Sequence, residues 1–240
     1  VDVEEKISNN TVAIVGIAGT TELGTIDPIS ELSEIAVEKN VHLHVDAAFG
    51  GLFISIMRLI GYNYPNIGFE NPGVSTITID PHKLGFVPIP SGGIIARSRE
   101  LFKHISVKAP YLLSEDHETI VGSRTGGSIA TTWAMLKYLG IEGYGEIFKE
   151  LLELKNYLVK RLEEIKSIEI PYMPMLPIVS FKHERIKSSK LREKLMEKGW
   201  ILYLAPMING LRIIVMPHLN KKVIDKFAED LENSIKEIEN

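Results

Sequence analysis

Short apolar runs alternate with a helical pattern in the first third of the chain. The segments Thr11–Thr21, Val41–Asp46 and Val74–Ile79 are rich in Val and Ile and predict strands. Between the first two, Asp27 and Pro28 predict the start of a helix, with Asp27 as its N-cap and Pro28 in its first turn. The order strand, helix, strand predicts a parallel βαβ unit.

Other segments are less regular. We expect irregular chain from Leu52 to Asn71 and a short fourth strand at Gly92–Ala96. A long stretch without clear periodicity, Lys108–Thr125, predicts a loop, and loops of this length inside a compact domain are usually functional or mobile. It leads into a helix over Ser128–Leu139, which Gly140 closes.

The pattern changes after a longer helix over Gly145–Ser167. The following elements are shorter, with strands at Leu176–Lys182, Trp200–Leu204 and Leu211–Met216 and helices at Ser188–Lys198 and Lys221–Ile238. The predicted architecture is therefore α/β. A large domain with a mostly parallel sheet takes residues 1–145, a connecting long helix takes 146–167, and a small α+β domain takes 168–240.

Composition narrows the function classes. The 27 basic and 31 acidic residues give a net charge of −4, which argues against nucleic acid as the main partner. No apolar run is long enough for a membrane span, and no signal peptide is visible, so we expect a cytoplasmic protein without a membrane partner. The chain has no Cys, which excludes disulfides and thiol catalysis. It also lacks Gln and is rich in charge, as thermophile proteins often are.

Polar residues follow the ends of the predicted parallel strands. Thr21, Asp46 and Lys83 each lie at or just past such an end, and open parallel sheets bind ligands there. A lysine can hold an aldehyde as a Schiff base, and a carboxylate can keep a pyridine nitrogen protonated, so this pair suits pyridoxal phosphate. Ala48 would let a flat ring lie close. The plainer alternatives are a turn carboxylate for Asp46 and a surface lysine for Lys83.

Further candidates surround this pair. His82 would point toward a cofactor phosphate or a substrate carboxylate, or be structural. The glycine-rich string GSRTGG, residues 122–127, opens a helix and suits an anion, and Arg124 adds a guanidinium fork. Tyr111 on the long loop is either a mobile proton donor or a surface tyrosine.

A metal site is the alternative from a different class. His42, His44 and Asp46 share one strand face, and this H-x-H-x-D string is similar to the metal-binding string of metallo-hydrolases. Ala47 stands where that family continues with His, and the string lies within a strand instead of in a loop after it. We therefore expect no metal.

Four strings together resemble the group II pyridoxal-phosphate-dependent amino acid decarboxylases, and more closely the archaeal L-tyrosine/L-aspartate decarboxylases. They are GTTELGTID, HVDAAFGG, DPHKLG and GSRTGG, in the family's order. The resemblance implies a fold type I domain, a homodimer with active sites at the subunit interface, and pyridoxal 5′-phosphate as cofactor. It covers nearly the whole chain but only the later part of the family's usual length.

The resemblance also implies roles for individual residues. Lys83 would be the Schiff-base lysine, Asp46 the partner of the pyridine nitrogen, and Tyr111 the residue that reprotonates the substrate α-carbon. The remaining positions would contact the cofactor or the substrate: Ala48 on one ring face, Thr21 beside the ring hydroxyl, His82 near the phosphate or substrate, Arg124 at a family arginine, and Thr125, Gly126 and Gly127 near the neighbouring subunit's phosphate.

The sequence also departs from the family. The family's first strands, its phosphate-binding Ser/Thr loop and its ring-stacking aromatic residue would precede Val1. We therefore expect full cofactor binding to need a missing N-terminal segment or a partner chain. The main functional hypothesis is decarboxylation of L-tyrosine, L-aspartate or both. The alternatives are a carbon–carbon lyase resembling sphingosine-phosphate lyase, a metallo-hydrolase and a non-catalytic subunit.

Overall fold

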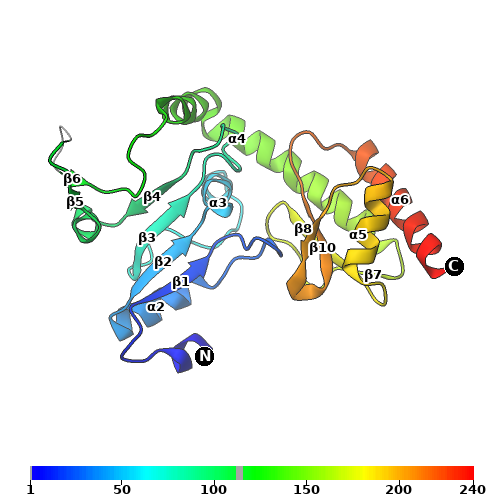
Figure 1. Cartoon of the computed structure of the whole chain (residues 1–240), viewed down its shortest axis with the longest axis horizontal. Helices are drawn as coiled ribbons and strands as arrows, with labels where there is room; N and C mark the ends of the chain where they lie inside the picture. The colour runs from blue at the N-terminus through cyan, green and yellow to red at the C-terminus, as the bar shows by residue number, and fades with distance from the viewer. Residues whose placement is uncertain (1, 112–115) are drawn as a thin grey trace. The chain divides into compact units, whose positions relative to one another are not determined.

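The computed structural model describes residues 2–111 and 116–240, which form two compact units (Figure 1). The first unit comprises Val1–Ala18 and Asp27–Ile141, and the second comprises Gly19–Ile26 and Glu142–Asn240. The division into domains at residues 145 and 167 stays a prediction. No helix in the described part of the chain is long and apolar enough to cross a membrane.

The first unit is built on a four-stranded sheet. Its strands are β1 (Ala13–Ile17), β2 (His42–Asp46), β3 (Val74–Ile79) and β4 (Gly93–Ala96), in the spatial order β1-β2-β3-β4 (Figure 1). The pairs β1–β2 and β2–β3 are parallel, whereas β4 runs antiparallel to β3. The mostly parallel sheet predicted from the sequence is thus confirmed.

Two helices cover the apolar residues of this sheet. Helix α2 (Ile29–Lys39) packs against β1 and β2, and α3 (Gly50–Leu59) packs against β3. On β2 the side chains of Leu43 and Val45 are fully buried, while the alternate residues between them are less buried. This period-two alternation leaves the His42, His44 and Asp46 face available for polar contacts.

Two local predictions are wrong. The stretch expected to be irregular from Leu52 contains helix α3, whose Phe53 and Met57 are fully buried. The sequence of α3 is apolar at nearly every position, which hides the helical period, although Ser55, Arg58 and Leu59 are exposed along one side of the helix. Asp27 is not the N-cap of α2. The cap is Pro28, and the Asp27 carboxylate instead accepts a hydrogen bond from the Ile17 N–H of β1 at 2.7 Å.

The rest of the first unit consists of small elements and the start of a long helix. The small elements are α1 (Asp2–Lys6), the 3-10 turn η1 (Arg99–His104), and the antiparallel pair β5 (Val107–Lys108) and β6 (Asp116–His117). Helix α4 (Gly126–Glu163) follows. Its backbone is non-helical at Gly140, where φ is 59° and ψ is −166°. The predicted closure of the first helical segment at Gly140 is confirmed.

The second unit holds the later part of α4, an antiparallel sheet and two further helices. The strands are β7 (Ile168–Glu169), β8 (Ile178–His183), β9 (Tyr203–Ala205) and β10 (Gly210–Ile214), in the order β7-β8-β10-β9. The 3-10 turn η2 (Pro206–Ile208) lies between β9 and β10, and the helices are α5 (Ser188–Glu197) and α6 (Lys221–Glu239). Asn220 caps α6, as expected, because its Oδ1 accepts the Val223 N–H at 3.1 Å.

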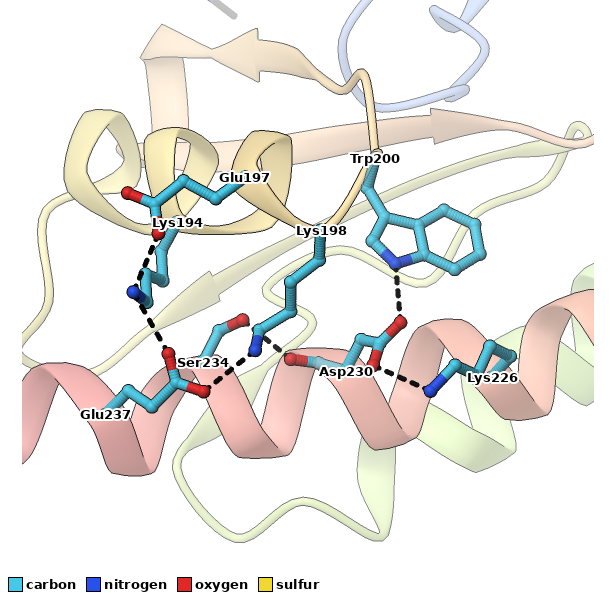
Figure 2. A network of polar contacts seen from close by, with 8 residues as sticks. All are labelled: Lys194, Glu197, Lys198, Trp200, Lys226, Asp230, Ser234 and Glu237. Atoms are coloured by element: carbon cyan, nitrogen blue, oxygen red, sulfur yellow. Dashed lines mark hydrogen bonds and ion pairs between the residues drawn. The ribbon is translucent and has the colours of Figure 1, made fainter.

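Polar contacts join α5 and the turn after it to α6 (Figure 2). The Trp200 indole N–H donates to Asp230 Oδ2 at 2.9 Å, and Lys226 lies 3.0 Å from Asp230 Oδ1. Glu237 pairs with Lys194 at 3.0 Å and with Lys198 at 2.8 Å. The Trp200 hydrogen bond, followed by the Lys226 contacts, lowers the pKa of Asp230 despite a smaller opposing effect of burial.

We expect Asp230→Ala to lower the free energy of unfolding by about 1–2 kcal/mol near neutral pH, because it removes the charged acceptor of the half-buried indole N–H. The pKa of Asp230 is depressed in the folded state, so its contribution is present above the ordinary aspartate pKa. The contribution is lost as the pH falls through the folded value, below about pH 4. Urea denaturation of both proteins at neutral and acidic pH measures this difference.

Glu232→Ala is the matched control. Glu232 makes an i,i+4 ion pair with Lys236 on the same helix, but both side chains are more than half exposed. Such a pair is worth less than about 0.5 kcal/mol. Equal losses of stability in the two variants would contradict a special role for Asp230.

Candidate active site

The carboxyl ends of β1, β2 and β3 are joined by backbone hydrogen bonds that continue past the strands. The Ala18 N–H donates to the Asp46 carbonyl at 2.9 Å, and the Ala47 N–H donates to the Thr78 carbonyl at 3.1 Å. One step further, the Asp80 N–H donates to the Ala48 carbonyl at 3.3 Å. The loop that carries Asp46 and Ala48 therefore lies directly beside the loop that leads to Lys83.

Lys83 lies in a tight turn that follows β3. Its backbone N–H donates to the Asp80 carbonyl at 3.0 Å, and its Nζ lies 3.1 Å from Asp80 Oδ2. The Lys83 side chain is 38% exposed and that of Asp80 18%. Lys83 is thus neither a free surface lysine nor a buried one, because its amine is held at the sheet edge by a carboxylate three residues earlier.

His82 is fixed by the strand-connecting segment after the turn. Its Nδ1 lies 2.5 Å from the Ser91 carbonyl oxygen and 3.3 Å from the Ser91 backbone nitrogen, and its own backbone N–H donates to that carbonyl at 3.1 Å. The Ser91 hydroxyl is 2.7 Å from that of Thr132, which in turn donates to the Ser128 carbonyl at 2.8 Å. These contacts tie the first turns of α4 to the His82–Lys83 turn.

Asp46 is the last residue of β2, and one of its carboxylate oxygens accepts a hydrogen bond. Its Oδ1 accepts the Ala48 N–H at 3.1 Å, which closes a turn typical of aspartate. In the described part of the chain its Oδ2 has no hydrogen-bond partner. Asp46 is half-buried, and Ala48 has a small, half-buried side chain two residues further on. The carboxylate oxygen can accept a hydrogen bond from the ring N–H of a flat heterocycle. The small side chain of Ala48 lets the face of such a ring come close.

The other predicted residues lie on three further segments. Tyr111 is 86% exposed and precedes residues 112–115 of the predicted loop, which lie outside the described residues. Arg124 is exposed, and Gly126 and Gly127 form the exposed first turn of α4, where N–H groups lack helical partners. Thr21 belongs to the second unit, where its carbonyl accepts a hydrogen bond from the Arg212 guanidinium.

The structure thus brings together only part of the predicted set. Asp46, Ala48, His82 and Lys83 share one sheet edge, and the Ser91–Thr132 bond joins the start of α4 to it. Sequence reasoning missed the residues that hold this edge in place, namely Asp80, Ser91 and Thr132, and it missed Arg212 in the second unit. Only Asp80 had a local signal, since an acid three residues before a lysine across a Pro-containing turn can reach it.

The H-x-H-x-D string is engaged in sheet contacts. Both ring nitrogens of His44 lie beside threonine hydroxyls of β3, at 2.8 Å from Thr76 and 3.0 Å from Thr78. His42 Nδ1 is 3.2 Å from the Ser75 hydroxyl. Among the described residues, no group of three or more His, Cys, Asp or Glu side chains could hold a metal ion. These contacts favour structural roles for both histidines.

The residues at the edge fit pyridoxal phosphate. Lys83 supplies a partly exposed amine, Asp46 an acceptor oxygen, and Ala48 a side chain small enough for a ring to approach. The exposed first turn of α4 suits an anionic group. An amine and an acid at one edge of a mostly parallel sheet are typical of the pyridoxal phosphate class of enzymes.

Comparison with known proteins identifies the family. Residues 2–184 match the pyridoxal-dependent decarboxylase conserved domain, so the chain belongs to the pyridoxal-dependent decarboxylase family. This confirms the family resemblance predicted from the four sequence strings.

The chain is similar to curated archaeal proteins. The chain is 46% identical over 226 residues to a probable L-tyrosine/L-aspartate decarboxylase of Methanosphaera stadtmanae, covering 94% of this chain and 58% of the relative. It is 44% identical over 237 residues to a probable L-aspartate decarboxylase of Pyrococcus abyssi, covering 98% and 61%. The chain therefore spans about three fifths of the length of these relatives.

Solved structures agree on the fold. A sphingosine-1-phosphate lyase of Burkholderia pseudomallei superimposes with a TM-score of 0.87 and 30% identity, covering 98% of this chain and 54% of the other. A glutamate decarboxylase of Lactobacillus brevis superimposes with a TM-score of 0.84 over 97% of this chain and 56% of its own, at 24% identity. The second likeness bears on the fold alone.

Proposed function

We propose that this chain is part of a pyridoxal-phosphate-dependent enzyme that decarboxylates an L-amino acid, aspartate, tyrosine or both, to the amine and carbon dioxide. The observation that carries the proposal is the shared sheet edge, where the Asp80–Ala48 backbone bond sets the Lys83 loop beside the Asp46 loop. The names of the relatives at 44–46% identity support the substrate class.

In this proposal the residues of the edge have distinct tasks. Lys83 would hold the cofactor through its aldehyde, and Asp46 would accept the N–H of the pyridine nitrogen and keep it protonated. Ala48 leaves room for one face of the ring. The bound ring accepts the electron pair released when the bond from Cα to the carboxylate breaks.

The remaining predicted residues bind and orient. We assign the phosphate or the substrate carboxylate to His82 and Arg124, because a guanidinium forks onto such anions and His82 is fixed by Ser91. Gly126 and Gly127 would offer backbone N–H groups to an anion. The family resemblance alone assigns Thr21 to the ring hydroxyl. Tyr111 returns a proton to Cα after carbon dioxide has left.

A second candidate function is carbon–carbon cleavage by the same cofactor. It is favoured by the structural likeness to sphingosine-1-phosphate lyase at 30% identity. The higher identity to the archaeal decarboxylases favours decarboxylation. Product analysis separates the two reactions, since a decarboxylase releases carbon dioxide and an amine whereas the lyase forms an aldehyde.

The proposal includes a homodimer. Ile129, Trp133 and Leu136 recur at helical spacing on the first part of α4, and each side chain is at least 46% exposed. Exposed apolar patches of this kind mark interaction sites, and a second copy of the protein is the partner that the family resemblance implies. The active sites would then lie at the subunit interface.

We expect Lys83→Ala to abolish both the visible absorbance band of the bound cofactor and carbon dioxide release, because no other group of the edge offers an amine. Absorbance spectroscopy and a carbon dioxide assay measure the two effects. Lys103→Ala is the control, since Lys103 also pairs with an acid three residues earlier but is 70% exposed. A Lys83→Ala protein that keeps the band and the activity would refute the assignment.

We expect Tyr111→Phe to slow amine formation by about 10²-fold or more while cofactor binding stays unchanged, because the phenol proton is lost but the ring remains. Amine quantification and the cofactor band test the two parts separately. Tyr138→Phe provides a matched control, since Tyr138 is equally exposed at 86%. Equal rates in wild type and Tyr111→Phe would remove Tyr111 from the mechanism.

A further inference from the structure

We propose that Asp80 is a positioning residue for Lys83, holding its amine in an ion pair that the amine must leave in order to bond to the cofactor. The inference rests on the proposed function, because it takes Lys83 as the site of covalent attachment. It concerns a residue outside the predicted site, and it is carried by the contacts of the Asp80 carboxylate.

The Asp80 carboxylate contacts both functional side chains of the turn. Its Oδ2 lies 3.1 Å from Lys83 Nζ and 3.7 Å from His82 Nε2. The His82 ring turns Nε2 toward this carboxylate because its Nδ1 is held beside the backbone of Ser91. One partly buried carboxylate oxygen therefore faces the amine and the imidazole together.

The position of Asp80 is fixed by its surroundings. Its N–H donates to the Ala48 carbonyl, and its carbonyl accepts the Lys83 N–H. Gly92 leaves space for the carboxylate, because a Cβ at that position would lie 2.5 Å from Asp80 Oδ1. Backbone contacts with the Ala48 loop and the Lys83 turn, together with the missing side chain at Gly92, thus set where the carboxylate lies.

The ion pair opposes the covalent step. An amine attacks an aldehyde carbon only when its nitrogen is free to approach that carbon, whereas Lys83 Nζ is held 3.1 Å from Asp80 Oδ2. When the bond forms, Nζ gives up its extra proton to solvent, the new C=N bond replaces C=O, and water leaves. The role of Asp80 is to hold and orient the amine until an aldehyde displaces the carboxylate.

Trace acetylation of the cofactor-free protein with acetic anhydride, read for each lysine by mass spectrometry, tests this directly. We expect Asp80→Asn to raise the labelling rate of Lys83 about two- to fivefold, which is what the loss of a partly exposed ion pair amounts to. Asp80→Glu, which keeps the charge, should label closer to the wild type. The rate at which added pyridoxal phosphate is captured should rise in Asp80→Asn in parallel.

Two lysines serve as internal references. Lys155 is buried and donates to the Pro174 carbonyl, so its labelling stays low only while the protein is folded. Lys103 pairs with Glu100 at the same spacing but on the surface, so Glu100→Gln shows what loss of an exposed pair does. We expect that change to be smaller than the one at Lys83.

Gly92→Ala tests the same contact without touching Asp80. The added Cβ displaces the Asp80 carboxylate, so the labelling rate of Lys83 should rise in this variant too. If Asp80→Asn does not fold, Gly92→Ala provides the test of the inference. Unchanged Lys83 labelling in a folded Asp80→Asn or Gly92→Ala protein overturns the inference. A wild type whose Lys83 carries no adduct after incubation with pyridoxal phosphate and reduction with borohydride overturns the proposed function instead, so the two failures are distinguishable.

Discussion

The parallel pairing of β2 with β3 is the constraint on which the candidate site depends. Because both strands run in one direction, Asp46 and the turn that carries Lys83 leave the sheet at the same edge. The hydrogen bonds of Ala47 and Asp80 extend this pairing past the strands. A one-residue slip would turn Asp46 toward the buried face occupied by Leu43 and Val45, so the register of the core also determines the chemistry.

Hydrogen bonds and ion pairs then fix the side chains that the strands place at this edge of the sheet. Asp80 holds the Lys83 amine, Ser91 holds the His82 ring, and Thr132 joins this turn to α4. These contacts join residues that lie up to 41 positions apart in the sequence. The site is therefore supported by residues that take no part in the proposed chemistry, and the stability of their contacts limits how precisely the functional groups are held.

The secondary structure could be predicted where sequence period and packing agree. The strand Val74–Ile79 and the Asn220 cap of α6 were correct, because a β-branched run and an asparagine before a helix have local causes. Helix α3 was missed because its sequence is apolar at nearly every position, which hides the amphipathic period even though one side of the helix is exposed. Asp27 was misassigned because its carboxylate bonds to β1, a contact that depends on how the chain returns to the sheet.

The sequence by itself determined the family, the mostly parallel sheet and the placement of Asp46 and Lys83 after successive strands. Each follows from local strings or from strand direction. Only the tertiary structure decided which residues hold Asp46 and Lys83 in place. The Asp80 carboxylate needs the space left by Gly92, and the His82 ring is held by the Ser91 carbonyl. It also placed Thr21 with the second unit, through the Arg212 contact. Such contacts join segments distant in sequence, and no local pattern specifies them.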